Sequence, residues 1–221
     1  MSNIRNRNSI IGVLLRDIYA FALRYLVRKR LPTGHIGSNS HIHSPSMIAT
    51  GSLKNIYLGD NVNIDWDNVI YATQGKFIMK NNSGAAVGLT VITNNHVGEI
   101  GHNFKEAKNA NLVGKDIVVE EEVWIAANVT LLAGTTLGRG SIIGAGSVLA
   151  GKHVPPYSVV MGNPAKVVGY RFTPEEIIEH EKSLYPESER IPLDVLEKNY
   201  RNYYLDHIKE IKAFTGLVCK I

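Results

Sequence analysis

Large aliphatic side chains recur at every sixth position in the second half of the chain, with small and polar residues between them. A period of six fits neither an amphipathic helix, which repeats near 3.6 residues, nor one half-buried strand, which repeats near two. If each aliphatic points inward, three such segments close a triangular turn of about 18 residues, and turns stack at about 4.8 Å. The six positions are Val119, Ile125, Leu131, Leu137, Ile143 and Leu149.

The residues around these aliphatics fit the same geometry. The position two before each aliphatic lies beside the core at a corner, so it should be small or β-branched. Turn positions favour glycine, which adopts positive φ without steric cost. The corner positions are Val123, Val129, Thr135, Ser141 and Ser147, and the turn glycines are Gly138, Gly140, Gly144 and Gly146.

The register continues upstream in three further sets of three, the last with one slip. About five turns between residues 36 and 154 therefore predict a mainly β fold, a parallel β-helix, rather than an antiparallel β-sandwich. The sets are Ile36, Ile42 and Ile48, then Leu58, Ile64 and Ile70, then Ile78, Ala85 and Val91.

Helical segments are expected at both ends of the solenoid. Residues 1–35 form an N-terminal amphipathic helical cap, with its apolar positions on one helical face. Residues 173–221 form a C-terminal helical extension, in which helices are predicted over about 174–184 and 193–213. Thr173 is the expected N-cap of the first, followed by a proline and two acidic residues.

Charge is unevenly distributed along the 221 residues. The net charge is +4, but residues 1–30 hold seven basic residues against one acidic residue, a local charge of +6. This predicts no nucleic-acid partner and permits a weak contact between the N-terminal helix and anionic lipid headgroups. One cysteine, Cys219, and no apolar run long enough for a membrane span favour a cytoplasmic protein, with possible peripheral contact with the inner membrane face.

The solenoid register breaks at residues 97–116, which we predict to be a projecting loop. A loop of this length in a compact domain is usually functional. His96 stands at its mouth, after Asn94 and Asn95, and histidine can act as a general base near neutral pH.

Several motifs together resemble one family. The repeat, "TNNH" before the loop, "VWIAANVTLLAGTTLGRGSIIGAGSVL" and "VPPYSVVMGNPAKVV" look like the hexapeptide-repeat acyltransferases. Within that family, the resemblance is greatest to the galactoside, maltose and xenobiotic acetyltransferases and to relatives that O-acetylate polysaccharides. The resemblance covers about residues 36–172. It implies a left-handed parallel β-helix and a homotrimer that binds acetyl-CoA between subunits, with no metal.

The resemblance also implies roles for individual residues. His96 matches the general base, which takes a proton from the acceptor hydroxyl as its oxygen attacks the thioester. The family's Thr-Lys pair after the last turn is replaced here by Ala150, Gly151 and Lys152, which leaves the placement of Lys152 open. The implied cofactor residues are Trp124, Ala127, Ala145, Ala150, Gly151, Lys152, Lys166 and Arg171, and the implied substrate residues are Asp65, Asn94 and Asn95.

Three other functions stay open at this point. They are amino-sugar N-acetylation, a non-enzymatic hexapeptide scaffold, and a γ-type carbonic anhydrase that holds zinc with three histidines. Only His96 and His102 flank the loop, which argues against the zinc site. The function expected is acetyl-CoA-dependent O-acetylation of a sugar or glycan hydroxyl, with the terminal helices favouring a cell-envelope glycan over a free antibiotic.

Overall fold

The computed structural model describes residues 35–43, 47–49, 51–96, 98–103, 106 and 113–216, together with separate positions between residues 11 and 25. The basic residues of the N-terminal segment and Cys219 lie outside the described residues.

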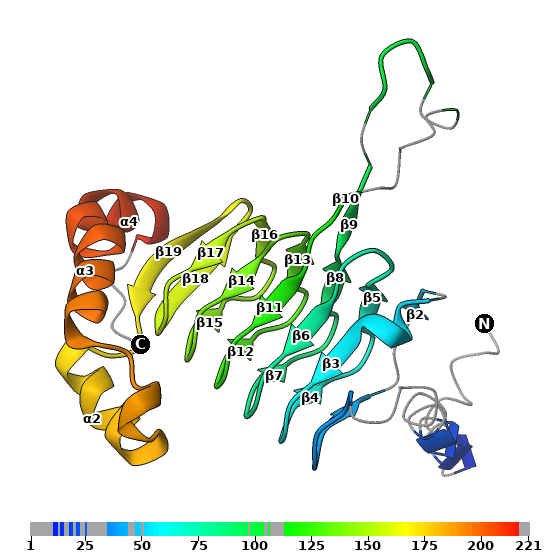
Figure 1. The fold of residues 1–221 in the computed structure, drawn as a ribbon, viewed down its shortest axis with the longest axis horizontal. Helices are drawn as coiled ribbons and strands as arrows, with labels where there is room; N and C mark the ends of the chain where they lie inside the picture. Colours follow the sequence, from blue (N-terminus) through cyan, green and yellow to red (C-terminus); the bar gives the residue numbers. More distant parts are fainter. Residues whose placement is uncertain are drawn as a thin grey trace.

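The described chain winds through three sheets in a repeating order, so that each turn adds one strand to each sheet (Figure 1). Sheet A contains β3 (Ile56–Leu58), β6 (Phe77–Met79), β11 (Ile117–Val119), β14 (Thr136–Leu137) and β17 (His153–Val154). Sheet B contains β1 (His41–Ile42), β4 (Asn63–Ile64), β7 (Gly84–Ala85), β12 (Trp124–Ile125), β15 (Ile142–Ile143), β18 (Ser158–Gly162) and β19 (Ala165–Tyr170). Sheet C contains β2 (Met47–Ile48), β5 (Val69–Tyr71), β8 (Thr90–Ile92), β13 (Thr130–Leu132) and β16 (Val148–Ala150).

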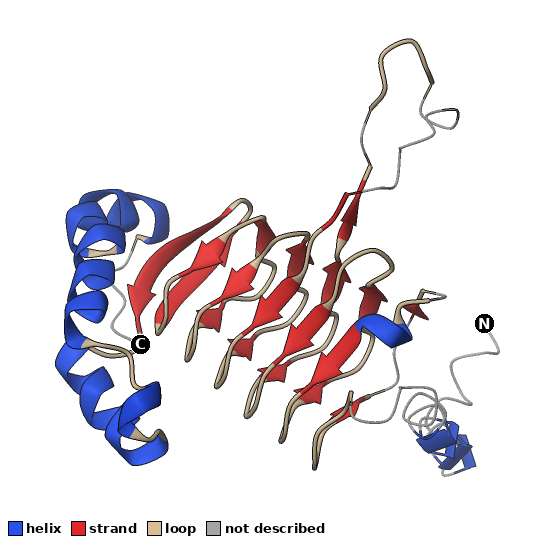
Figure 2. Ribbon diagram, viewed as in Figure 1, coloured by secondary structure: helices blue, strands red, loops and turns tan. Residues whose placement is uncertain are grey.

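Neighbouring turns pair in parallel until the last pair, β18 and β19, which is antiparallel and ends sheet B. This mainly β solenoid of about five turns, with helices at its C-terminal end (Figure 2), confirms the predicted fold class. Its winding is consistent with a left-handed β-helix.

The core is a single column of aliphatic side chains inside the prism. All six residues of the period-six series are fully buried, and so are the five predicted corner residues. Each buried aliphatic contributes about 1.5–3 kcal/mol relative to an exposed one. The small corner residues leave room for the backbone to turn, so the hexapeptide period follows directly from the triangular cross-section.

The predicted register is wrong at one position. Ile78 lies in the middle of β6 and faces outward, whereas Phe77 and Met79 on either side are fully buried. Met79 pairs with Val119 and occupies the position that the period had assigned to Ile78. Strand β6 consists of three apolar residues and buries its two ends, so the sequence allowed two neighbouring registers and tertiary pairing selected one.

The turns adopt the backbone conformations that their residues favour. Gly140 and Gly146 have positive φ, as do the stacked Asn39, Asn61 and Asn82, whose side-chain amides bond to one another at 3.1 Å. Asparagine tolerates the left-handed region better than other residues with a Cβ. Gly140 has a second constraint, because a Cβ there would lie 2.4 Å from the ring of Tyr157.

Three helices cover the C-terminal end of the solenoid: α2 (Pro174–Leu184), α3 (Leu193–Tyr203) and α4 (Ile208–Thr215). The predicted first helix is confirmed with its cap, because Thr173 accepts the backbone N–H of Glu176 and the Glu176 carboxylate accepts that of Thr173. Short 3-10 turns lie at η1 (Leu53–Asn55), η2 (Glu187–Glu189) and η3 (Leu205–His207).

The second predicted helix, 193–213, is broken into two. Tyr204 leaves the helical conformation between α3 and α4 and is buried against the Tyr170 and Tyr200 rings. No glycine or proline marks this break. Packing of Tyr204 and Ile211 against the last strands of the solenoid therefore overrides the continuous apolar stripe.

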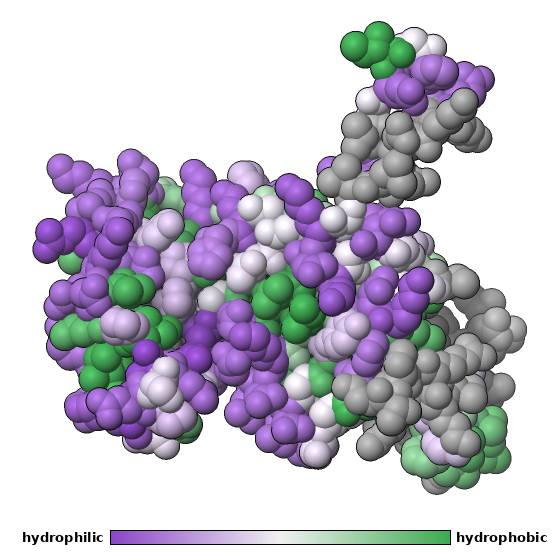
Figure 3. Space-filling view, viewed as in Figure 1, coloured by the Kyte–Doolittle hydropathy of each residue, from purple (hydrophilic) through white to green (hydrophobic). Residues whose placement is uncertain are grey.

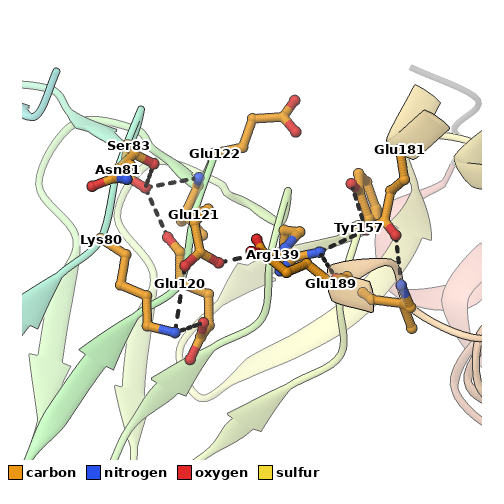
Figure 4. Close-up of polar contacts among 12 residues, drawn as sticks. Lys80, Asn81, Ser83, Glu120, Glu121, Glu122, Arg139, Tyr157, Glu181 and Glu189 are labelled. Atoms are coloured by element: carbon orange, nitrogen blue, oxygen red, sulfur yellow. Dashed lines mark hydrogen bonds and ion pairs between the residues drawn. The ribbon is translucent and has the colours of Figure 1, made fainter. Parts of the chain in front are cut away.

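A chain of charged side chains joins the solenoid to α2 (Figure 4). Arg139, in a turn of the solenoid, pairs with Glu121 and with the fully buried Glu181 of α2 at 3.2 Å. Glu181 also accepts the Tyr157 hydroxyl at 3.1 Å and the Ile191 backbone N–H. Burial and the nearby Glu181 carboxylate raise the pKa of Tyr157. The buried carboxylate is thus fully hydrogen-bonded, as burial of a charge requires.

Candidate active site

The long loop leaves the prism at the edge between sheets C and A, which we call the C–A edge. Its base is a short antiparallel pair, β9 (Asn94–Asn95) and β10 (Val113–Gly114) (Figure 1). Buried Thr93 fixes this base, since its hydroxyl donates to the Gly75 carbonyl at 3.1 Å and accepts the Gly75 N–H. The described loop residue Ile100 is fully exposed.

His96 lies immediately after β9, exposed on the C–A edge. Its backbone N–H donates to Oδ1 of Asn95 at 2.9 Å, which holds the main chain at this position. Oδ1 of Asn94, in contrast, is buried and has no hydrogen-bond partner among the described residues. A buried acceptor without a donor is costly, so an incoming ligand or chain at this edge would complete it.

Other predicted residues share the C–A edge with His96. Ala150 ends strand β16, and Gly151 and Lys152 follow it, before β17. Lys115 ends the loop on the same edge, and its backbone N–H donates to the Thr93 carbonyl at 2.9 Å. Sequence reasoning missed Lys115, although its place between the loop and the restart of the repeat was visible.

A second group lies on the opposite side of sheet C, at the edge between sheets B and C, the B–C edge. Ala127 follows β12, Ala145 follows β15 and Asp65 follows β4, so the three occupy turns of this one edge. The Gly146 N–H donates to the Ala127 carbonyl at 2.9 Å, which shows that these turns stack directly. Ala127 and Ala145 each carry only a methyl group, and we call this part of the B–C edge the Ala127–Ala145 track.

Trp124 lies beside this track on the outer face of sheet B and is 52% exposed. Its ring covers Gly84 on the next strand, where an added Cβ would lie 3.0 Å from the indole. Trp124 and Arg171 line one open hollow of about 360 Å³. The Arg171 guanidinium is bound there by Glu122 at 3.0 Å and by the Gly140 carbonyl at 2.9 Å, so it has a structural partner already.

The C-terminal end of the solenoid carries a cavity of about 270 Å³ under α4. It brings together Lys152 and Lys166, two cations that were both expected to bind the cofactor. Phe214 and Tyr203 supply aromatic walls, and the Lys166 ammonium lies 5.8 Å from the centre of the Phe214 ring. Two cations beside aromatic walls suit an anionic group attached to a flat ring.

One chain therefore does not assemble all predicted residues into a single pocket. His96 is on the C–A edge, while Ala127 and Ala145 are on the B–C edge, with the width of sheet C between them. Within the described residues, no group of three or more histidine, cysteine or acidic side chains could hold a metal ion. The described helices also include none that is long and apolar enough to cross a membrane.

Comparisons with known proteins agree with this architecture. A family model described as bacterial transferase hexapeptide (six repeats) matches residues 116–151. A maltose O-acetyltransferase from Clostridium difficile 630 is 26% identical, with a TM-score of 0.55, and the alignment covers 65% of this chain and 72% of that chain. A hexapeptide-repeat acetyltransferase from Vibrio cholerae is 25% identical, with a TM-score of 0.54 and coverage of 66% and 77%.

A galactoside acetyltransferase in complex with coenzyme A shares the fold at 21% identity, with a TM-score of 0.54 and coverage of 85% and 82%. No curated protein sequence matches the chain.

Proposed function

We propose that the chain is a hexapeptide-repeat acyltransferase that transfers the acetyl group of acetyl-CoA to a sugar or glycan hydroxyl. Its repeat, its fold and its similarity to known acetyltransferases support this proposal. The observation that carries the acceptor chemistry is the position of His96 at the base of a long loop, beside the unsatisfied Asn94 amide. Similarity to a maltose O-acetyltransferase supports oxygen over nitrogen as the attacking atom.

The proposed reaction needs no covalent enzyme intermediate. The His96 imidazole takes the proton of the acceptor hydroxyl as its oxygen attacks the thioester carbonyl. The tetrahedral intermediate then expels the CoA thiolate, which receives that proton from the imidazolium. A general base of this kind contributes about 10²–10⁴ in rate.

Acetyl-CoA would lie along the B–C edge. Ala127 and Ala145 give its pantetheine arm a smooth track, with Trp124 beside it. The phosphates would lie toward the C-terminal end, where Lys152 and Lys166 line one cavity. A charge-assisted contact with a phosphate is worth about 1.5–3 kcal/mol.

The active site is completed by a second copy of the chain in a homotrimer. One outward row of sheet C is apolar and carries Tyr71, Ile92 and Leu132 in register. If this face turns toward a three-fold axis, the B–C edge of one copy meets the C–A edge of the next. His96 of one copy then faces the Ala127–Ala145 track of its neighbour.

The N-terminal segment would contact the membrane surface weakly. Exposed apolar side chains gather there (Figure 3), and the first 30 residues carry a net charge of +6. An apolar face with basic residues favours anionic lipid interfaces. Sedimentation with anionic but not neutral vesicles is the expected result, and no difference between the two would contradict it. The apolar residues are Ile11, Leu14, Leu15, Ile18, Tyr19, Phe21 and Tyr25.

The deciding experiment is a calorimetric titration of the purified chain with CoA and with acetyl-CoA. We expect one CoA bound per chain, followed by acetyl transfer to sugar acceptors. Alkaline hydroxylamine should remove the product acetyl group, because it cleaves esters and leaves amides intact. A chain that binds no CoA at millimolar concentration would contradict the proposal, and a resistant product would identify an amine acceptor.

A further inference from the structure

Three aromatic side chains from two successive turns form a cluster on the N-terminal part of the B–C edge. The rings of His41 and His43 meet edge to face with their centres 4.4 Å apart. The His43 ring stacks against the Trp66 indole, with centres 5.6 Å apart and planes inclined by 27°. Trp66 remains 37% exposed, so the cluster presents an aromatic surface to solvent.

The main chain beneath this cluster is firmly held. Buried Asn68 donates from its amide to the His43 carbonyl at 2.9 Å and to the Asp65 carbonyl at 2.8 Å, and so joins the two turns. The backbone N–H of Trp66 donates to Oδ1 of Asp65 at 2.9 Å. A platform fixed in this way binds a ligand with little loss of conformational entropy.

Trp66 is unusually large for its place. The equivalent positions in the later turns are Val87, Ala127 and Ala145, and backbone hydrogen bonds connect these turns in series. Small residues at this edge satisfy the fold, because none of them enters the core. An exposed indole in the same row is therefore not required for folding and suits a binding surface.

The height of Trp66 along the solenoid gives its role. His96 and Val87 belong to the same turn, with Trp66 one turn before it and Ala127 one turn after it. Equivalent turns of a three-fold ring lie at equal height. This inference rests on the proposed acetyl transfer, in which acetyl-CoA lies along the turns that follow His96, beginning with that of Ala127. The turn that precedes His96, which carries Trp66, is then left for the acceptor.

We propose that Trp66, stacked on His43, is the platform that binds the acceptor's pyranose ring and selects a neutral sugar. Aromatic faces pack against the C–H face of a sugar ring, and the Asp65 carboxylate can accept hydrogen bonds from the sugar hydroxyls. Asp65 and Asp67 flank the indole in sequence, and their negative charges oppose a sugar carboxylate.

Saturation-transfer NMR tests the platform without requiring turnover. The probes are the methyl glycosides of glucose, galactose and glucuronic acid, added to the full-length protein. Ring protons of the two neutral glycosides should receive saturation, and those of the glucuronide should receive less. Trp66→Leu should weaken neutral-glycoside binding by about two- to tenfold, the value of an aromatic stacking contact, and Trp66→Phe should keep most of it. Asp65→Asn with Asp67→Asn should strengthen glucuronide binding.

Two controls separate this inference from the proposed function. Tyr57→Leu removes a partly exposed aromatic from sheet A and should leave sugar binding unchanged. CoA affinity should be equal in wild type and Trp66→Leu. A protein that binds CoA but no neutral glycoside, or equal glycoside binding in all Trp66 variants, would overturn the platform. Glycoside binding that depends on Trp66 without any CoA binding would leave the platform standing and refute the acetyltransferase proposal.

Discussion

At the scale of single residues, the base of the loop determines where His96 lies. Thr93 and Asn95, which precede it, fix the main chain through hydrogen bonds to Gly75 and to the His96 N–H. The imidazole itself contributes nothing to the buried core, because it is exposed. Its substitution should therefore affect chemistry far more than stability.

His96→Ala should lower kcat by at least about a hundredfold, the lower bound for loss of a general base. The apparent molecular mass and the CoA affinity should stay unchanged. Steady-state kinetics with a sugar acceptor, together with calorimetry, provide the measurement. Turnover within a few-fold of wild type would remove His96 from the mechanism.

Lys166→Ala and Lys152→Ala should each weaken CoA binding by about ten- to a hundredfold if each cation contributes 1.5–3 kcal/mol. The effect on kcat at saturating acetyl-CoA should be small, because both residues line the C-terminal cavity and His96 does not. Dephospho-CoA is the matched ligand, and a variant that has lost a phosphate contact should discriminate less between it and CoA. Unchanged affinity in either variant would exclude that lysine from the site.

At the scale of elements, Arg139 holds the C-terminal helices on the solenoid. Arg139→Met would leave the fully buried Glu181 carboxylate without its cation, at a cost of about 3–5 kcal/mol in the free energy of unfolding. Lys182→Ala on the same helix breaks only an exposed pair with Glu179 and should cost less than about 1 kcal/mol. Urea unfolding of both variants compares them, and equal losses would contradict the role of Arg139.

The same network should make stability sensitive to acid. Partial burial opposes ionisation of Glu121, but a backbone hydrogen bond and the charges of Lys80 and Arg139 lower its pKa below the ordinary 4.5. The unfolded chain takes up this proton first as pH falls, so the stabilisation is present above pH 4.5 and is lost as pH falls through the folded pKa. Unfolding of Glu121→Gln measured between about pH 6 and pH 3 should show a flatter pH dependence than wild type.

The sequence predicted elements where local chemistry and packing agree. The period of six, the small corner residues and the cap at Thr173 each express a local steric or hydrogen-bonding need, and the structure has all of them. It could not predict the break at Tyr204 or the outward turn of Ile78, because both follow from contacts between distant segments. The separation of His96 from the Ala127 track, in contrast, follows from the period itself, because His96 comes after the third aliphatic of its turn and Ala127 after the second of the next.

At the scale of the whole molecule, the proposed homotrimer would assemble through the outer face of sheet C. Leu132→Asp places a charge on its apolar row and should convert a trimer into monomers with little change in the fold, because the side chain points outward. Thr136→Asp, at an outward position of the next strand in sheet A, is the matched control and should remain trimeric. Light scattering gives the masses, and a trimeric Leu132→Asp would place the interface elsewhere.

Activity should follow assembly, because the proposed donor-binding residues and the proposed base, His96, lie on different edges of one copy. Monomeric Leu132→Asp should lose acetyl transfer although both edges are intact. A mixture of Leu132→Asp with active-site variants should also be inactive. A fully active Leu132→Asp monomer would show that one chain forms the site alone.

The loop is inserted between strands that do not depend on it. β6 and β11 pair in register across the insertion, with Ile117 opposite Phe77 and Val119 opposite Met79, and β8 pairs with β13 on the adjoining face. The strands on either side of the insertion therefore keep the same pairing that uninterrupted turns have. The segment between β9 and β10 can therefore change in length and sequence during evolution without altering the strands that carry the proposed acetyl-CoA site.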